Sequence, residues 1–531
     1  MRHVSILSAR NAAALIHDGD TVSISSSSAL GCPDEVLCGI EERFGEGAGP
    51  FELTVVMPIA AGDMYGVAGV DRLAAPGLIS RVIAGSLPSG PSSAEPPAIW
   101  RLIENDAIEA YNLPSGVLFQ MHRAGASGQP GVFTHVGLDT FIDPRHCGGR
   151  MNSRTKDDIV EVTDLRDKEW LFFPAVVPDV AIVRATTADE NGNLTFEDEG
   201  STLGALDLAY AAHNNGGVVI AQVKRVATAG SLPPQDVRLP GILVDAIVVA
   251  PDQWQTTQTP YDPALSGQLR QPLTVIQPAE WSIDKVIARR AATELAAGDV
   301  VNLGFGISAL VPRILVEEGC GEAVTWVIEQ GAVGGVPLTG FAFGCALNAD
   351  ALLPSVDQFT LLQGGGFDHA FLSFLEVDQF GNVNVHHLPS RRHVTAGVGG
   401  FADITSRARS IVFSGAFTAG GRDVAVEDGR VVVRREGRMP KFVEQVSGVT
   451  FSGRRALAQG QRVLYITERC VMELREQGMT VTEVAPGINL ERDVLAQAMF
   501  PLIVADGLIE MDATLFRPEP GVLAELARGP Q

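Results

Sequence analysis

Two blocks of this chain recur in the same order, and this internal repeat restricts the fold more than any other feature. Gly19 and Asp20 recur as Gly298 and Asp299, 279 positions further on. The eighteen residues 179–196 (DVAIVRATTADENGNLTF) align without a gap with residues 368–385 (DHAFLSFLEVDQFGNVNV), 189 positions further on. Two blocks in one order indicate two related halves, and the first half carries extra residues between its blocks.

The alternation of short β-branched runs with Ala-rich stretches is typical of α/β layers with parallel strands. The boundary between the halves is expected near residues 255–280, a polar segment rich in Pro and Gln. We therefore predict two related open α/β domains, residues 1–275 and 276–531. Each should have a mainly parallel sheet with flanking helices.

The second half contains a pattern of strand, glycine loop, helix, strand and acid. Ser282 is expected to cap a helix that stops at Gly298, and a buried strand should follow at residues 300–303. A glycine loop, a helix and a second strand at residues 323–328 come next. The carboxyl ends of parallel strands meet at one edge of a sheet, where open α/β sheets bind ligands. The glycine loop and the residue after the second strand should therefore lie together.

Glu329 is that residue, and it stands in the sequence EQG. A carboxylate at a strand end among small residues can be a metal ligand, a base or a nucleophile. The alternative is a solvated loop glutamate or a helix-capping acid. The glycine loop itself consists of Gly304, Phe305, Gly306, Ile307 and Ser308. Such a loop lets backbone N–H groups approach an anion or a thioester closely.

A further glycine cluster precedes a helical stretch in the second half. It consists of Gly397, Val398, Gly399, Gly400 and Phe401. Its backbone amides could form an oxyanion hole, which stabilises charge that develops on a carbonyl oxygen. The simpler interpretation is a tight turn that needs positive φ.

The net charge, the cysteine spacing and the histidine spacing exclude several classes of protein. The net charge of −23 argues against nucleic acid as a partner, because phosphate binding needs concentrated Lys and Arg. A signal peptide and a membrane-length apolar run are both missing, and the six cysteines form no C-x-x-C pair, so we expect a cytoplasmic protein with reduced thiols. His386, His387 and His393 lack helical metal-ligand spacing, so we predict a solvated loop and no metal site.

Together these residues resemble the class I coenzyme A transferases, and above all the single-chain acetate/propionate type that acts on short-chain acyl-CoA and 3-oxo acids. The segments that carry the resemblance are GLISRVIAG, IEAYNLPSGV, VGLDTFIDPR, GNVNV, GVGGFADIT and MFPLIVADGL. The two halves match the fused α-like and β-like subunits of that family. The resemblance also implies a homo-oligomer, a tetramer or a dimer.

The resemblance implies roles for the motifs. Glu329 corresponds to the nucleophilic glutamate of the family's Glu-x-Gly motif, residues 397–401 to its oxyanion and CoA-contacting loop, and residues 304–308 to the loop that lines the CoA site. The implied reaction moves CoA from an acyl-CoA to a carboxylic acid by ping-pong kinetics through a glutamyl-CoA thioester. CoA is then a co-substrate, and no metal or other cofactor is needed.

The chain departs from the family pattern at two places. Residues 25–31 read SSSSALG where the family has a glycine-rich segment, and Ser115 stands where related enzymes commonly carry Gln. Ser is too short to supply an amide donor at the same reach. We therefore expect an altered acid-substrate pocket and an acid other than simply acetate or acetoacetate.

Three other functions are compatible with some of these residues. Water that reached the glutamyl thioester would turn the same scaffold into an acyl-CoA hydrolase. More distant alternatives are a sugar-phosphate isomerase and a ligand-sensing domain, but an isomerase would not need both EQG and GVGGF, and a sensor should carry a basic DNA-binding segment.

Overall fold

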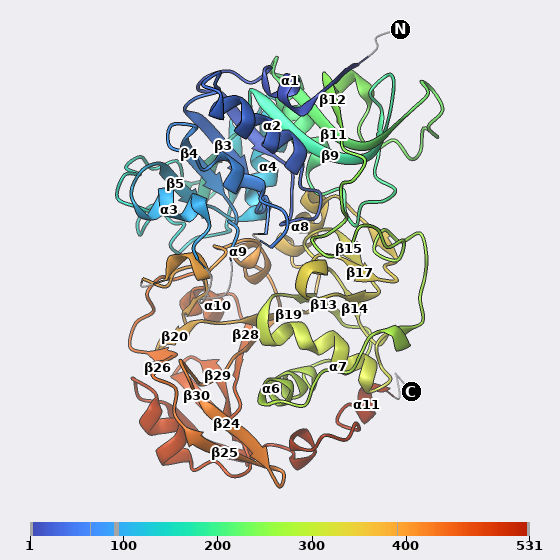
Figure 1. Ribbon diagram of the computed structural model, residues 1–531. Coiled ribbons are helices and arrows are strands. Elements are labelled where there is room, and N and C mark those ends of the chain that lie inside the picture. Colours follow the sequence, from blue (N-terminus) through green and yellow to red (C-terminus); the bar gives the residue numbers. More distant parts are fainter. Residues whose placement is uncertain (1–3, 64, 90–94, 390, 528–531) are drawn as a thin grey trace.

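A computed structural model of the chain describes residues 4–63, 65–89, 95–389 and 391–527. Two sheets form the centres of an upper and a lower half, which stack on each other (Figure 1). Every strand of the first sheet lies before residue 250, and every strand of the second lies after residue 299. The order of elements is α/β in both halves, as predicted.

The first sheet has the strand order β1-β12-β11-β9-β2-β3-β4-β5. All neighbours along this path are parallel, and a short antiparallel strand, β10, pairs with β9. The bounds are β1 Ser5–Leu7, β2 Thr21–Ile24, β3 Leu53–Met57, β4 Ile79–Ala84, β5 Glu109–Asn112, β9 Val180–Asp189, β10 Leu194–Thr195, β11 Val218–Ala227 and β12 Ala246–Val249.

The second sheet has the order β14-β13-β19-β22-β28-β29-β30-β31. Neighbouring strands are parallel from β14 to β28. The pairs β28–β29 and β29–β30 are antiparallel, and the pair β30–β31 is parallel. The bounds are β13 Val300–Leu303, β14 Thr325–Trp326, β19 His369–Ser373, β22 Ser410–Ser414, β28 Arg462–Ile466, β29 Cys470–Arg475, β30 Gly478–Val484 and β31 Ile503–Glu510.

Helices flank both sheets, and short strand pairs occupy the connections. The α-helices are α1 Ala9–Ala13, α2 Asp34–Gly45, α3 Ala98–Glu104, α4 Ser115–Ala126, α5 Ala205–His213, α6 Ile283–Ala292, α7 Val311–Glu317, α8 Ser355–Gln363, α9 Phe401–Thr405, α10 Gly453–Ala458 and α11 Ala524–Ala527. The remaining strands are β6 Gly131–Thr134, β7 Glu161–Asp164, β8 Glu169–Pro174, β15 Ala332–Val333, β16 Val336–Pro337, β17 Ala346–Leu347, β18 Ala351–Leu352, β20 Glu376–Asp378, β21 Val383–Asn384, β23 Thr418–Ala419, β24 Asp423–Glu427, β25 Arg430–Arg435, β26 Met439–Pro440 and β27 Phe442–Val443.

The repeated sequence blocks make the same contacts in both halves. The main-chain N–H and the Nδ2 of Asn193 donate to the carboxylate of Asp189, over 2.9 and 3.0 Å. The same two donors of Asn382 bind Asp378, each over 3.0 Å. Strands β2 and β9 are parallel neighbours, as are β13 and β19 at the corresponding positions. The sequence repeat is therefore also a structural one.

A hydrophobic core joins the two halves. One buried cluster contains side chains from both, while two further clusters belong to the first and the second half respectively. In the shared cluster the rings of Phe119 on α4 and Phe359 on α8 lie 6.0 Å apart. Helix α4 thus packs its apolar side against the second half, which brings the carboxyl edge of the first sheet close to it.

The predicted elements before Glu329 are confirmed in part. Ser282 caps α6 by accepting a hydrogen bond from the Lys285 amide over 3.2 Å, and β13 has the predicted bounds. The predicted stop at Gly298 is wrong, since α6 ends at Ala292. The strand predicted at residues 323–328 is too long, since β14 covers only Thr325–Trp326. The chain turns back directly afterwards, where the Ile328 amide binds the Ala332 carbonyl over 2.9 Å.

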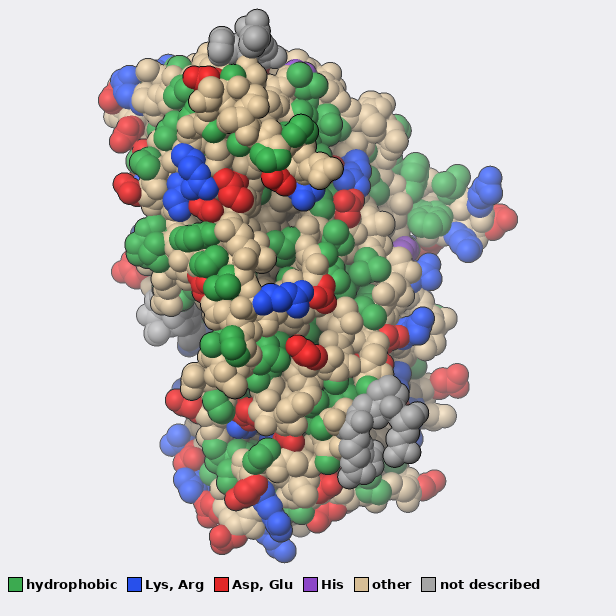
Figure 2. All heavy atoms as spheres, turned by 90° about the vertical axis from the view of Figure 1, so that its right-hand side faces the viewer, with side chains coloured by type: hydrophobic (Ala, Val, Ile, Leu, Met, Phe, Trp, Pro, Cys, Tyr) green, Lys and Arg blue, Asp and Glu red, His purple; other side chains and the backbone are tan. Residues whose placement is uncertain are grey.

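On the face in Figure 2, Lys and Arg side chains lie among Asp, Glu and hydrophobic side chains instead of forming a basic stripe. Among the described residues no helix is both long and apolar enough to cross a bilayer. All six cysteines have free thiols.

Candidate active site

Glu329 lies just beyond β14 at the carboxyl edge of the second sheet. Its side chain is buried, with 9% of its surface exposed, and its Oε2 has no hydrogen-bond partner among the described residues. Neighbouring β13 supplies Asn302, whose Nδ2 binds the Val327 carbonyl over 2.7 Å. An unpaired buried carboxylate oxygen is costly, which points to a role other than folding.

Burial changes the acidity of Glu329. Loss of solvation raises its pKa from an ordinary 4.5 to about 7, while hydrogen bonding by its own backbone and by Asn302 opposes the rise. Near neutral pH the side chain therefore exists in both protonation states. A weakly solvated carboxylate of this kind is a better nucleophile than an exposed one.

The third residue of EQG must be glycine. Gly331 has φ of 125°, and a Cβ at this position would lie 1.9 Å from the Leu353 carbonyl oxygen. Both the backbone angle and the lack of space exclude a side chain. The Gly331 amide binds the Ile328 carbonyl over 2.8 Å, so the tight turn holds Glu329 at the sheet edge.

The glycine loop after β13 lies at the same edge, as predicted. A Cβ on Gly306, which has φ of 89°, would lie 2.5 Å from the Ser373 hydroxyl at the end of β19. That hydroxyl donates to the Phe305 carbonyl over 2.8 Å. The Phe305 ring is 63% exposed and stacks on Phe343, with the ring centres 3.7 Å apart. The loop therefore presents backbone and an aromatic surface beside the strand that carries Asn302.

The glycine cluster at residues 397–401 joins the second half to the first. The Val398 amide binds Oδ1 of Asn112 over 2.8 Å, and the Gly399 amide binds the Gly85 carbonyl over 2.7 Å. The Ser115 amide in turn binds the Gly399 carbonyl over 2.9 Å. Gly85 follows β4 and Asn112 ends β5, so the cluster lies on the carboxyl edge of the first sheet.

These contacts restrict which amides of the cluster could stabilise an oxyanion. Val398 and Gly399 already donate to the first half, and the Phe401 amide binds the Val398 carbonyl over 2.9 Å. Within the described part of the chain, the amides of Gly397 and Gly400 have no hydrogen-bond acceptor. They are the available donors of this loop.

A second buried carboxyl group lies at the junction of the halves. Asp403 on α9 accepts hydrogen bonds from the Gly116 amide over 3.0 Å and from Gln363 Nε2 over 2.8 Å. Burial raises the pKa of Asp403 to about 7, and the charge of Glu329 adds to the rise. Helix α9 therefore carries a second buried carboxyl group, which is held by donors from both halves.

Both departures from the family pattern lie around this site. Gln330, next to Glu329, donates from Nε2 to the Ser27 hydroxyl over 3.3 Å, so the serine segment of the first half touches the EQG turn. Ser115, the first residue of α4, is 1% exposed, and its hydroxyl has no partner among the described residues. The first half thus supplies polar groups to a site whose carboxylate belongs to the second.

Asn112, Asn302 and Asp403 were not predicted from the sequence to be site residues. Asn112 lies inside a quoted motif, directly before the LPSG segment, but only the fold shows that it holds the Val398 amide. The solvated loop predicted for the histidines is wrong at His386, whose ring stacks on Phe141 with the centres 3.6 Å apart. Among the described residues, no group of three or more His, Cys, Asp or Glu side chains could hold a metal.

A buried glutamate and two glycine loops at the carboxyl edges of two sheets are typical of an α/β enzyme whose site lies at the strand ends. Comparison with known proteins makes the class specific. Residues 6–250 match the family model described as Coenzyme A transferase. The chain is 42% identical to the caffeate CoA-transferase of Acetobacterium woodii over 96% of this chain and 97% of that one. It is 38% identical to the acetate CoA-transferase YdiF of Escherichia coli K12, over 97% and 95%.

Solved structures agree with these sequence relatives. The acyl-CoA transferase YdiF of Escherichia coli O157:H7, as apoenzyme, superposes with a TM-score of 0.90 at 37% identity, and the match covers 97% of each chain. A thioester complex of that protein with CoA superposes with a TM-score of 0.89. The chain belongs to the coenzyme A transferase family and is a CoA-transferase.

Proposed function

We propose that this CoA-transferase uses Glu329 to move CoA from a short-chain acyl-CoA to a carboxylic acid. The observation that carries this proposal is the buried Glu329 carboxylate, whose Oε2 is unpartnered beside a glycine loop at the sheet edge. The relatives named as caffeate and acetate CoA-transferases support the reaction class and extend the candidate acids to an aromatic one.

The first half-reaction forms the thioester in two steps. The Glu329 carboxylate attacks the thioester carbonyl of the donor, and the free amides of Gly397 and Gly400 stabilise the negative tetrahedral oxygen. Collapse of this intermediate gives an acyl-glutamyl anhydride and releases CoA as a thiolate. The thiolate then attacks the Glu329 carbonyl and releases the donor's carboxylate, leaving a glutamyl-CoA thioester.

The second half-reaction reverses these steps with the acceptor. The acceptor carboxylate attacks the glutamyl thioester and expels CoA thiolate, which then attacks the acyl carbon of the new anhydride. Glu329 leaves as a carboxylate and the acceptor becomes an acyl-CoA. The energy of the thioester is retained only if water is kept from the buried glutamyl carbonyl.

Further expectations go with this function. We propose that the enzyme needs no metal and no cofactor beyond the CoA of its substrates, does not act on nucleic acid or at a membrane, and works as a homo-oligomer in the cytoplasm. Acyl-CoA hydrolysis is the second candidate function. It should be tested because Ser115 and Ser27 lie where the sequence departs from the family pattern.

Steady-state kinetics test the function. With an acyl-CoA donor varied at several acetate or caffeate concentrations, ping-pong transfer gives parallel double-reciprocal lines. Intersecting lines would contradict the covalent route. Steady release of CoA in the complete absence of an acceptor would show that the enzyme hydrolyses acyl-CoA.

A further inference from the structure

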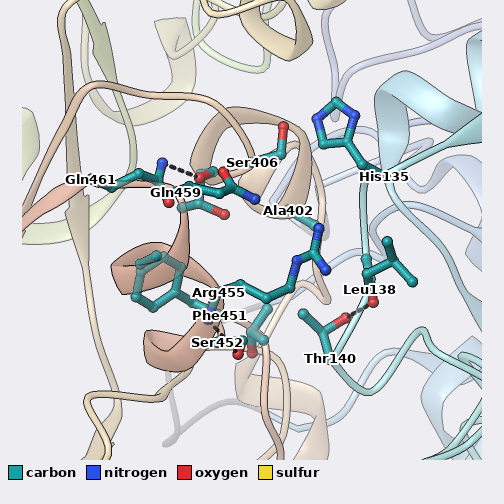
Figure 3. A pocket seen from close by; sticks show the side chains of 14 residues that line it. His135, Leu138, Thr140, Ala402, Ser406, Phe451, Ser452, Arg455, Gln459 and Gln461 are labelled. Carbon is teal, nitrogen blue, oxygen red and sulfur yellow. Dashed lines mark hydrogen bonds between the residues drawn. The ribbon is translucent and has the colours of Figure 1, made fainter. Parts of the chain in front are cut away.

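A cavity separate from the candidate active site opens between the two halves (Figure 3). Its walls come from the segment after β6 in the first half and from α9 and α10 in the second. A second cavity of about 310 Å³ adjoins it, and the two share His135, Arg455 and Gln459. Neither is lined by Glu329, Ser115 or residues 397–401.

Arg455 is the central cation of these cavities. Figure 3 shows its side chain extending from α10 into the space toward His135. Among the described residues its guanidinium group has no hydrogen-bond acceptor and no ion-pair partner. Nearby carboxylates are already paired, Asp139 with Arg454 over 2.6 Å and Glu169 with Arg145 over 2.7 Å. Half-burial without a partner is unfavourable for a guanidinium group, as the lowered pKa of Arg455 reflects.

Two more cations border the second cavity. Lys168 and Arg407 line it, and within the described chain neither side chain pairs with a carboxylate. In a protein with a net charge of −23, three unpaired cations at one cavity create a local positive potential. Glu169 also lines the cavity and shares Arg145 with Asp143, so one negative charge there offsets part of the charge of the three cations.

Neutral groups complete the cavity. The Nε2 of His135 is buried and has no partner among the described residues. Burial lowers the pKa of His135 to about 4, with Arg407 and Arg455 adding to the effect, so the ring is neutral at pH 7 and Nε2 can act as a donor. Trp170 provides an apolar wall, with its ring centre 6.4 Å from that of His135.

We propose that these adjoining cavities bind a small oxyanion, a carboxylate or a phosphate, with Arg455 as the main contact and Lys168, Arg407 and His135 around it. Guanidinium groups bind both kinds of oxyanion through paired N–H donors. The Trp170 wall suits a ligand that carries an apolar body next to its charge. The proposal is independent of the chemistry assigned to Glu329, because it shares no residue with it.

Binding to the full-length protein tests the proposal. Isothermal titration with inorganic phosphate and, separately, with benzoate should show saturable binding of at least one of the two anions. Arg455→Ala should weaken that binding about tenfold or more, since a charge-assisted hydrogen bond is lost. The matched control is Arg475→Ala, which removes a surface arginine that pairs with Glu473 and lines neither cavity, and which should leave binding unchanged.

The two anions distinguish the sources of the ligand. Tighter binding of benzoate identifies an organic carboxylate, and tighter binding of phosphate identifies a phosphate ligand. Lys168→Ala and Arg407→Ala alter exposed side chains, and each should weaken binding even if Arg455→Ala fails to fold. Binding that is undetectable in the wild type, or equal in the wild type and these variants, would overturn the proposal.

Discussion

The main-chain amide of Val398 donates a 2.8 Å hydrogen bond to Oδ1 of Asn112, and this bond joins the candidate oxyanion loop to the opposite half of the molecule. Asn112 is 2% exposed, and its Nδ2 donates to the carbonyls of Ala84 and Gly85 at the end of β4. One side chain thus fixes the loop relative to the first sheet. Preorganised donors of this kind are what an oxyanion site requires.

Asn112→Ala should therefore impair catalysis as well as stability. The Val398 amide loses its acceptor, which should cost about 1–3 kcal/mol in the free energy of unfolding. Displacement of the loop should lower kcat at least about tenfold with little change in KM. Chemical denaturation and initial rates measure the two effects. Asn214→Ala, which removes a surface hydrogen bond to Ala126, is the control and should change neither quantity. A normal kcat in Asn112→Ala would show that the loop position does not matter.

Gly331→Ala should abolish thioester formation. The new Cβ would lie 1.9 Å from the Leu353 carbonyl oxygen, so the EQG turn must rearrange and move Glu329. Gly319→Ala is a matched control, because Gly319 also has positive φ, 73°, but its added Cβ would meet open space. The control should lose only about 1 kcal/mol of stability and keep its activity. Equal activity of both variants would refute the steric explanation of the motif.

Ser115→Ala tests whether the orphaned hydroxyl contacts the acid substrate. If it does, KM for the acceptor acid should rise several-fold to about tenfold, while KM for the acyl-CoA donor stays constant. The melting temperature should not fall, because the lost hydroxyl has no partner among the described residues. Initial rates with each substrate varied in turn measure the difference. An unchanged KM for every acceptor tested would show that Ser115 does not contact the acid substrate.

The raised pKa of Glu329 makes a prediction about stability and pH. The folded state holds this proton more tightly than the unfolded chain, so its contribution to stability falls as pH rises from about 4.5 to about 7 and then levels off. Glu329→Gln cannot ionise. Between pH 5 and pH 8 the free energy of unfolding of this variant should therefore rise by about 1–3 kcal/mol relative to that of the wild type. Urea denaturation at both values measures this gain, and the exposed substitution Glu280→Gln should show none. A difference that is independent of pH would mean that Glu329 keeps an ordinary pKa.

Much of the second half could be predicted from the sequence because its signals are local. The Ser282 cap, the strand at residues 300–303 and the position of Glu329 at the sheet edge follow from periodicity, capping and the rules for parallel sheets. The internal repeat also predicted a second sheet of related topology, and the parallel pairing of β2 with β9 and of β13 with β19 confirms it.

The contacts between the halves could not be predicted in this way. The bond between Val398 and Asn112 spans 286 residues, and the bond between Asp403 and Gly116 spans 287. No spacing rule relates such distant residues, since their meeting depends on how α4 packs against α8 and α9. The predicted length of β14 was wrong for a related reason, because the turn at Gly331 depends on the backbone of the distant Leu353.

The covalent attachment of CoA to Glu329 can be observed by peptide mass spectrometry. After incubation with an acyl-CoA alone, digestion should give a peptide containing residue 329 with the added mass of CoA on Glu329. Borohydride should reduce the thioester and inactivate the enzyme. Glu329→Ala should form no adduct and have no transferase activity. Full turnover by Glu329→Ala, or an active wild-type enzyme whose adduct lies on another residue, would show that Glu329 is not the nucleophile.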